Sequence, residues 1–169
     1  MQQISIKQSW LAIALGSAGL AGASIIITPW LDLHPCHLCI FQRLLYTLLA
    51  LTALASALTL TKPRWQPLFT GLTLLLALTG LATASYQSWL QAQPKPPLSC
   101  GMGEQTLLEV FVDWLGQQLP SLFLATGYCE DKELVILTLS LANWSLVAFT
   151  LVLLVAGISL YRQRAVENK

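Results

Sequence analysis

The chain carries few charged residues for its length. Asp, Glu, Lys and Arg make up only 10% of its 169 residues, whereas a typical soluble domain has about 25%. These charges are clustered, so long stretches of the sequence contain none. Hydrophobic residues account for 55% of the chain, and the mean hydropathy is +0.64. Lipid is therefore expected to be the solvent for much of this protein.

Other features are also missing, and each absence narrows the possible functions. The net charge is only +1, which gives no reason to expect binding to nucleic acid. The sequence contains no internal repeat and no low-complexity tract. A chain of this length suits one compact domain, residues 1–169, with little left for a separate soluble domain.

Four apolar segments are long enough to cross a membrane as helices, which requires about 20 residues each. They run approximately over residues 10–29, 40–61, 68–89 and 141–161. The second segment contains one charge, Arg43, in its first turn. Aromatic side chains that settle at lipid–water boundaries lie near the segment ends: Trp10, Trp30, Trp65, Trp89, Trp144 and Tyr161. We predict an all-α membrane protein built on a four-helix transmembrane bundle.

The distribution of Lys and Arg predicts the orientation of the bundle. The basic residues flank the spans mainly on one side, at Lys7, Lys62, Arg64, Arg162, Arg164 and Lys169. Because the side rich in Lys and Arg faces the cytoplasm, both termini are expected inside, and the outer loops, residues 30–39 and 90–140, outside. The first apolar segment could alternatively be a signal peptide cleaved near Ala21-Gly22-Ala23. Its apolar run exceeds the usual length of about 7–15 residues, which favours a retained span.

The second outer loop is the only long one. It begins with Pro94-Lys95-Pro96-Pro97, a run that favours extended backbone. Residues 104–119 then predict a short amphipathic helix, with Leu107, Phe111 and Trp114 on its apolar side. This helix could lie along the membrane surface or pack on the ends of the spans, and the sequence leaves both possibilities open.

The four cysteines are Cys36, Cys39, Cys100 and Cys129, and none of them lies in the middle of a predicted span. On the predicted topology, all four face the compartment where disulfides persist. Of the three possible pairings, we expect Cys36–Cys39 and Cys100–Cys129 in the resting protein. A Cys-x-x-Cys pair closes a very small ring and constrains the unfolded chain little. Its spacing is instead typical of exchangeable dithiols.

The surroundings of Cys39 favour redox chemistry. Cys39 falls where the second span begins, and the positive end of a helix stabilises a thiolate. Arg43 follows four residues later, so the two side chains share one helix face. A guanidinium in this position would favour the thiolate or hydrogen-bond a bound oxyanion or carbonyl. The alternative is an arginine that extends from the helix end toward lipid headgroups.

Zinc and covalent haem are both disfavoured. His34, Cys36, His37 and Cys39 could be zinc ligands, but a second close pair of ligands is missing. Covalent haem attachment requires His directly after the second cysteine, where this chain has Ile40. Both histidines are therefore expected to be exposed loop residues, although His37 could tune the redox potential of its neighbours.

The second pair of cysteines has two interpretations. A disulfide between Cys100 and Cys129 would close a loop of roughly 30 residues and stabilise the fold by about 3–4 kcal/mol. Gly101, Gly103 and Gly127 favour mobility near both sulfurs instead, and a mobile, exposed disulfide is open to attack by a partner thiolate. The sequence leaves the structural and the reactive interpretations open.

The segment Pro35-Cys36-His37-Leu38-Cys39-Ile40-Phe41-Gln42-Arg43 resembles the signature of the DsbB family of bacterial inner-membrane disulfide-bond formation proteins. Four spans, a short first outer loop and a long second one extend the resemblance over nearly the whole chain. Residues 97–100 and 125–129 resemble the segments around that family's second cysteine pair.

The resemblance implies a protein-thiol oxidase. Cys100–Cys129 would oxidise a periplasmic, thioredoxin-like protein of the DsbA type, with Cys100 forming the mixed disulfide. Cys129 would then pair transiently with Cys36. This exchange would release Cys39 as a thiolate beside a membrane quinone, either ubiquinone or menaquinone.

By the same resemblance, Arg43 corresponds to the family's quinone-proximal arginine. Many members carry His in the third span near the quinone, and Gln87 stands approximately there, as a candidate quinone contact. Two other functions are compatible with the sequence: a membrane scaffold whose disulfides only staple its loops, and a thiol or quinone reductase of the vitamin K epoxide reductase type. A reductase that passes electrons outward would normally need thiols reachable from the cytoplasm, and the predicted topology provides none.

Overall fold

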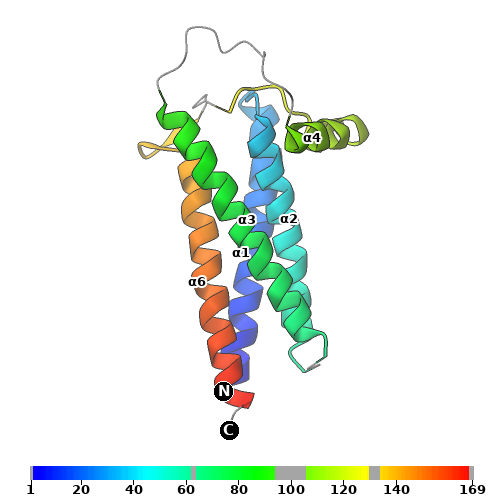
Figure 1. Ribbon diagram of the computed structural model, residues 1–169, viewed down its shortest axis with the longest axis vertical. Helices are drawn as coiled ribbons and strands as arrows, with labels where there is room; N and C mark the ends of the chain where they lie inside the picture. The colour runs from blue at the N-terminus through cyan, green and yellow to red at the C-terminus, as the bar shows by residue number, and fades with distance from the viewer. Residues whose placement is uncertain (1, 62–63, 94–105, 130–133, 168–169) are drawn as a thin grey trace.

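A computed structural model describes residues 2–61, 64–93, 106–129 and 134–167. Its long helices are α1 (Gln2–Trp30), α2 (His37–Leu58), α3 (Gln66–Ala92) and α6 (Leu141–Glu167). The shorter elements are α4 (Leu107–Gln118), α5 (Pro120–Phe123), β1 (Val135–Ile136) and β2 (Leu139–Ser140). Figure 1 shows the four long helices side by side, with the start of α1 and the end of α6 at one end and α4 at the other.

The four predicted membrane-spanning helices are confirmed. Each of α1, α2, α3 and α6 is long and apolar enough to cross a membrane. Helices α1, α3 and α6 extend beyond the predicted boundaries because apolar runs do not include polar end turns, whereas α2 ends before its predicted boundary. Helix α3, for example, begins at Gln66 and continues to Ala92, while α2 begins at His37 and ends at Leu58. Helix α2 starts earlier than expected because Cys36 caps it.

The side chains are distributed as expected for a protein in lipid. Large apolar residues cover the outer surface, including Leu15 (73% exposed) and Leu51 (61% exposed). Several hydroxyl side chains lie inside, where they donate to carbonyls of their own helices. Ser56 Oγ, for instance, donates to Thr52 O at 3.0 Å, and Thr73 Oγ1 donates to Phe69 O at 2.8 Å. These two buried hydroxyls are thereby satisfied without water, whereas the hydroxyls of Ser17, Thr70 and Ser88 have no partner among the described residues.

Close packing at the centre of the bundle depends on one glycine and one aromatic pair. The rings of Tyr46 on α2 and Phe149 on α6 stack with centroids 4.4 Å apart and an interplanar angle of 4°. The Phe149 ring also lies directly over Gly80 of α3, where a Cβ atom would overlap the ring. The small residues Ala77 and Ala84 are fully buried on the same helix. Three helices can therefore approach closely at this level.

Helix α4 projects sideways from the end of the bundle (Figure 1). Thr106 and Glu109 form a capping box at its N-terminus. Val112 and Gly116 are buried, and the helix contacts α2 and α5. Its predicted apolar residues instead remain outside, with Leu107 90% and Trp114 54% exposed. The predicted helix is thus confirmed over Leu107–Gln118, and its predicted start near residue 104 lies outside the described residues.

A short hairpin that the sequence did not predict precedes α6. Strands β1 and β2 pair antiparallel, with Ile136 opposite Leu139. The two turn residues, Leu137 and Thr138, have positive φ values of 51° and 69°. This turn normally uses Asn or Gly, so the residues gave no signal for it. The hairpin is fixed to the bundle where Trp144 Nε1 donates to Ile136 O at 3.0 Å.

A substitution of Gly80 tests the central packing. Gly80→Leu places a side chain where the Phe149 ring lies, and overpacking of this kind costs about 1–3 kcal/mol. For a chain of this size we expect the thermal midpoint in detergent to fall by about 2–4 °C per kcal/mol. Gly71→Leu on the same helix is the control, because nothing lies within 4 Å of a Cβ atom there. Equal midpoints for the two variants would contradict this packing.

Candidate active site

The N-terminus of α2 is built around Cys36. Cys36 is the N-cap residue, with extended backbone angles of φ −80° and ψ 169°, and its sulfur accepts a hydrogen bond from Cys39 N at 3.4 Å. The first amides of a helix have no partner within the helix, so a polarisable sulfur in this position satisfies one of them. Cys39 therefore lies inside the first turn of α2, and its backbone N–H is the one that the Cys36 sulfur caps.

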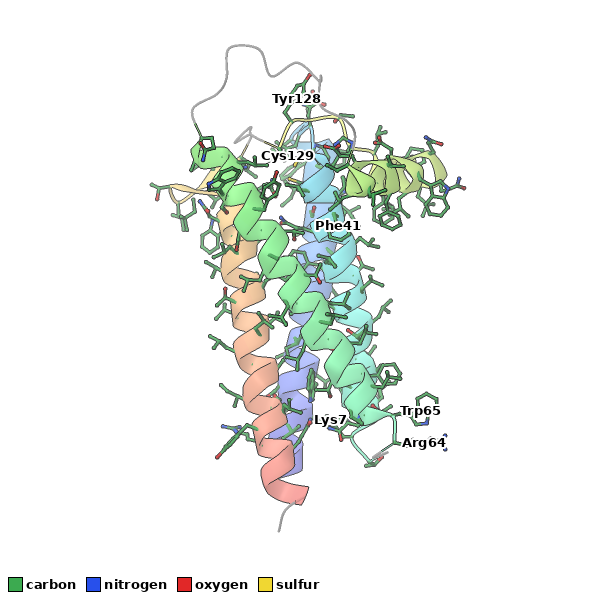
Figure 2. The ribbon with its side chains drawn as sticks, in the orientation of Figure 1. Lys7, Phe41, Arg64, Trp65, Tyr128 and Cys129 are labelled. Carbon is green, nitrogen blue, oxygen red and sulfur yellow. The ribbon has the colours of Figure 1, made fainter. Side chains whose placement is uncertain are left out.

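Three cysteines from two loops meet at this helix end. The sulfurs of Cys36 and Cys39 are 3.1 Å apart, and Cys36 is buried. The side chain of Cys129, from the second outer loop, hydrogen-bonds to Cys36 and accepts from the backbone N–H of Leu38. All three cysteines are thiols in the structure. Figure 2 places Cys129 at the end of the bundle that carries α4, and Cys100 lies outside the described residues.

The hydrogen bonds of Cys36 and Cys129 shift the pKa values of these two thiols in opposite directions. The hydrogen bond from Cys36 lowers the pKa of Cys129, with a further contribution from the Leu38 amide that acts against the effect of burial. The pKa of Cys36 is raised by its hydrogen bonds to Cys129 and Cys39 and by burial. Of the two thiols, Cys129 therefore loses its proton more readily, and Cys36 holds its proton more tightly.

Gln87 on α3 lies directly beside the two sulfurs of α2. Its Nε2 group is 3.0 Å from Cys39 Sγ and 3.5 Å from Cys36 Sγ. Its Oε1 atom accepts a hydrogen bond from Gln42 Nε2 at 2.8 Å, and both glutamines are buried. Because Gln42 engages the oxygen of Gln87, the amide nitrogen is directed at the sulfurs. An N–H group in this position stabilises a thiolate on Cys39.

Arg43 is buried and makes its hydrogen bonds within the protein. Its Nε donates to Ser24 Oγ at 3.0 Å, and its Nη2 donates to Thr28 Oγ1 at 2.7 Å, both on α1. Its Nη1 donates to the carbonyl of Leu122 in the second outer loop at 2.6 Å. Only 4% of Arg43 is exposed, so the alternative of an arginine extended toward headgroups is wrong.

A small cavity joins these side chains. Cys36, Cys39, Arg43 and Gln87 line it, together with residues of α1, the second outer loop and the start of α6. Its volume is about 70 Å³. The structure therefore brings together Cys36, Cys39, Arg43 and Gln87, four of the residues singled out in the sequence.

The second outer loop is seated on the first by backbone hydrogen bonds. The carbonyl of Pro35 accepts from Thr126 N at 2.9 Å and from Gly127 N at 3.2 Å. A Cβ atom on Gly127 would overlap the backbone carbonyl of His34. The expectation that Gly127 provides mobility is wrong, because this glycine allows a close approach between two backbone segments.

A side-chain pair also connects the two loops. His37 Nε2 lies 2.9 Å from Asp113 Oδ1 on α4. The expectation of an exposed loop histidine is wrong for His37, which is the first residue of α2 and half-buried. His34, by contrast, is exposed. The sequence offered no signal for the Asp113 partner, since 76 positions separate the two residues.

Sequence reasoning also missed Gln42, Ser24 and Thr28, which position Gln87 and Arg43. A signal for them did exist. Ser24 and Thr28 are four residues apart on one face of an otherwise apolar helix end, and Thr28 Oγ1 donates to Ser24 O at 2.7 Å. Polar residues on one helix face in a span commonly serve a buried polar partner on a neighbouring helix.

A bundle of four membrane-spanning helices, with a Cys-x-x-Cys pair and a third cysteine at one helix start, defines a membrane thiol–disulfide oxidoreductase. The family model described as "Disulfide bond formation protein DsbB" matches residues 6–159. The chain belongs to the DsbB family, as its resemblance to the family signature implied.

Similar proteins carry the same description. The "Disulfide bond formation protein B" of Dechloromonas aromatica is 40% identical over 144 residues, covering 84% of this chain and 85% of its own. The protein of that description from Aromatoleum aromaticum is 35% identical, with 95% of each chain covered. That from Nitrosomonas europaea is 34% identical, over 94% of this chain and 95% of its own. The chain is therefore a multi-pass membrane protein of disulfide-bond formation.

Replacing Gln87 tests its action on Cys39. In a variant whose other cysteines are serine, Gln87→Leu removes the N–H donor at 3.0 Å from the sulfur. Hydrogen bonds to charged groups contribute about 1.5–3 kcal/mol, so Cys39 should react with iodoacetamide at least about tenfold more slowly at neutral pH. Ser85→Ala on the exposed side of α3 is the control. Equal alkylation rates in both variants would show that Gln87 does not act on Cys39.

Proposed function

We propose that this protein oxidises the dithiol of a periplasmic, thioredoxin-like partner of the DsbA type and passes the electrons to a membrane quinone, ubiquinone or menaquinone. The observation that carries the proposal is the position of Cys129. This cysteine of the second outer loop is hydrogen-bonded to Cys36, whose sulfur is 3.1 Å from that of Cys39. Membership of the DsbB family supports the same direction of electron flow.

The first exchange takes place in the second outer loop. A partner thiolate attacks Cys100 of the Cys100–Cys129 disulfide, which forms a mixed disulfide and releases Cys129 as a thiolate. The role of Cys100 is taken from the family resemblance. The Leu38 amide lowers the pKa of Cys129, which favours the thiolate form of the released sulfur as the next nucleophile.

The second exchange moves the disulfide bond between the loops. The Cys129 thiolate attacks Cys36 of the Cys36–Cys39 disulfide, which forms Cys36–Cys129 and releases Cys39 as a thiolate beside Gln87. The partner's second thiolate resolves the mixed disulfide and leaves oxidised. The released Cys100 thiolate then attacks Cys129, which restores Cys100–Cys129 and leaves Cys36 and Cys39 as a dithiol. Two electrons and two protons have now reached the end of α2.

The residues around Cys39 suit a quinone headgroup. Gln87 and Arg43 are N–H donors of the kind that a quinone carbonyl accepts from, and both line the cavity with Cys39. When bound, a quinone supplies the acceptor for two electrons and two protons, which allows the Cys36–Cys39 disulfide to form again. A benzene-sized ring occupies a cavity of about 150 Å³. The cavity here is about 70 Å³, so the lining side chains must move apart to admit the ring.

The orientation of the protein completes the proposal. Lys7 and Arg64 lie at the end of the bundle opposite Cys129 (Figure 2). Because the end rich in Lys and Arg faces the cytoplasm, the cysteine loops face the periplasm and the bundle lies in the bacterial inner membrane. Disulfides persist in the periplasm, where the thioredoxin-like partner is found.

Two cysteine substitutions test the proposed relay. With the purified protein in quinone-containing nanodiscs under anaerobic conditions, we expect Cys39→Ser to abolish quinone reduction by the reduced partner. Cys100→Ser should instead prevent capture of a partner whose resolving cysteine is absent, as seen by non-reducing electrophoresis. Quinone reduction that persists without Cys39 would rule out the proposed route, and so would undiminished capture without Cys100.

Replacing Arg43 tests the quinone site. Arg43→Leu removes a donor worth about 1.5–3 kcal/mol, so KM for quinone should rise by at least about tenfold while both disulfides still form. Arg43→Lys keeps the charge but cannot reach α1 and Leu122 together, and should give an intermediate KM. Arg64→Leu, which removes an exposed charge at the other end, is the control. An unchanged KM for quinone in Arg43→Leu would show that Arg43 does not contribute to quinone binding.

A further inference from the structure

We propose that Gly127 is a positioning residue for the exchange between the two outer loops. Because it has no side chain, the segment before Cys129 can seat against the backbone of His34 and Pro35, and this seat holds the Cys129 sulfur beside Cys36. The inference rests on the proposed relay and adds a residue to it.

The seat consists of backbone atoms. Two consecutive amides, Thr126 N and Gly127 N, donate to the single carbonyl of Pro35 at 2.9 and 3.2 Å. Pro35 directly precedes Cys36, and Gly127 stands two residues before Cys129. A carbonyl next to one reacting cysteine therefore fixes the segment that carries the other.

The requirement for glycine is one of space. A Cβ atom at position 127 would overlap the carbonyl oxygen of His34 and approach its carbonyl carbon at 2.8 Å. Both atoms belong to the backbone, so no side-chain rotation can relieve the overlap. The φ angle of Gly127 lies outside the left-handed region, so alanine could adopt the same backbone angles if space allowed. Alanine must instead push the two loops apart.

The rest of the segment cannot absorb such a displacement easily. Upstream, the Leu122 carbonyl is held by Arg43 Nη1, and α4 is joined to α2 through Asp113 and His37. Downstream, Cys129 is held by the amide of Leu38 and by Cys36. A disulfide requires Cα atoms about 4.4–6.8 Å apart with correctly directed Cβ atoms, so separation of the loops at Gly127 acts directly on the Cys36–Cys129 bond.

The first measurement follows that bond alone. In a variant with Cys39→Ser and Cys100→Ser, only Cys36 and Cys129 remain, and the rate of their disulfide formation with oxidised glutathione is measured by mass spectrometry. Misplacement of reacting groups by about 1 Å costs up to about 100-fold, so we expect Gly127→Ala to slow this reaction by at least about tenfold. Thr126→Ala, which keeps both amides and changes only an exposed side chain, should leave the rate unchanged. Equal rates for all three proteins would overturn the proposal.

The second measurement uses the chain with all four cysteines. Gly127→Ala should lower partner-driven quinone reduction by at least about tenfold. When Cys100 and Cys129 are both serine, quinone reduction driven by dithiothreitol enters at Cys36–Cys39, and Gly127→Ala should not change it. A loss of this second activity would show general damage to the site and would overturn a positioning role. If the Gly127→Ala variant oxidises the partner as fast as the parent protein does, the positioning role of Gly127 is refuted and the proposed function is not. If the parent itself fails to reduce quinone with the partner, the proposed function is refuted.

Discussion

A buried guanidinium joins the three parts of the molecule that have to meet. Arg43 belongs to α2, but its hydrogen bonds go to Ser24 and Thr28 of α1 and to the carbonyl of Leu122 in the second outer loop. Detachment of the loop would leave one buried N–H of this charged group without its partner, at a cost of about 1–3 kcal/mol or more. The interaction that makes a charge tolerable inside the bundle therefore also fixes where the second loop crosses the first.

The arrangement of the sulfurs follows from this crossing. Cys129 lies at the start of α2, where hydrogen bonds from the Cys36 side chain and the Leu38 amide lower its pKa. Cys39 lies farther into the bundle, beside the Gln87 amide. Cys36 thus contacts both of the other sulfurs, and each of those two has its own amide donor, Leu38 for Cys129 and Gln87 for Cys39. This order suits a relay that begins with a soluble protein and ends with a hydrophobic oxidant.

Most of the fold could be predicted from the sequence, because the membrane dictates long apolar helices and the four apolar runs match α1, α2, α3 and α6. The Cys-x-x-Cys pair at a helix start could also be predicted. The contacts that assemble the site could not, because they depend on how segments far apart in the sequence pack against one another. The pairing of Gln42 with Gln87 spans 45 positions, and the seat at Gly127 joins two loops with no shared pattern. For the same reason, the sequence around Gly127 predicts mobility, whereas in the structure this glycine allows a close approach between two backbone segments.

The transfer of the disulfide bond from the second loop to the first is the central step of the proposed relay, and rapid anaerobic mixing tests it most directly. Oxidised protein in quinone-containing nanodiscs is mixed with reduced thioredoxin-like partner, quenched with an alkylating agent at successive times, and digested for mass spectrometry while quinone absorbance is followed in parallel. A peptide pair joined by Cys36–Cys129 should appear first and decay as the quinone absorbance falls. Loss of quinone absorbance with Cys100–Cys129 intact and no Cys36–Cys129 species at any time would contradict the relay.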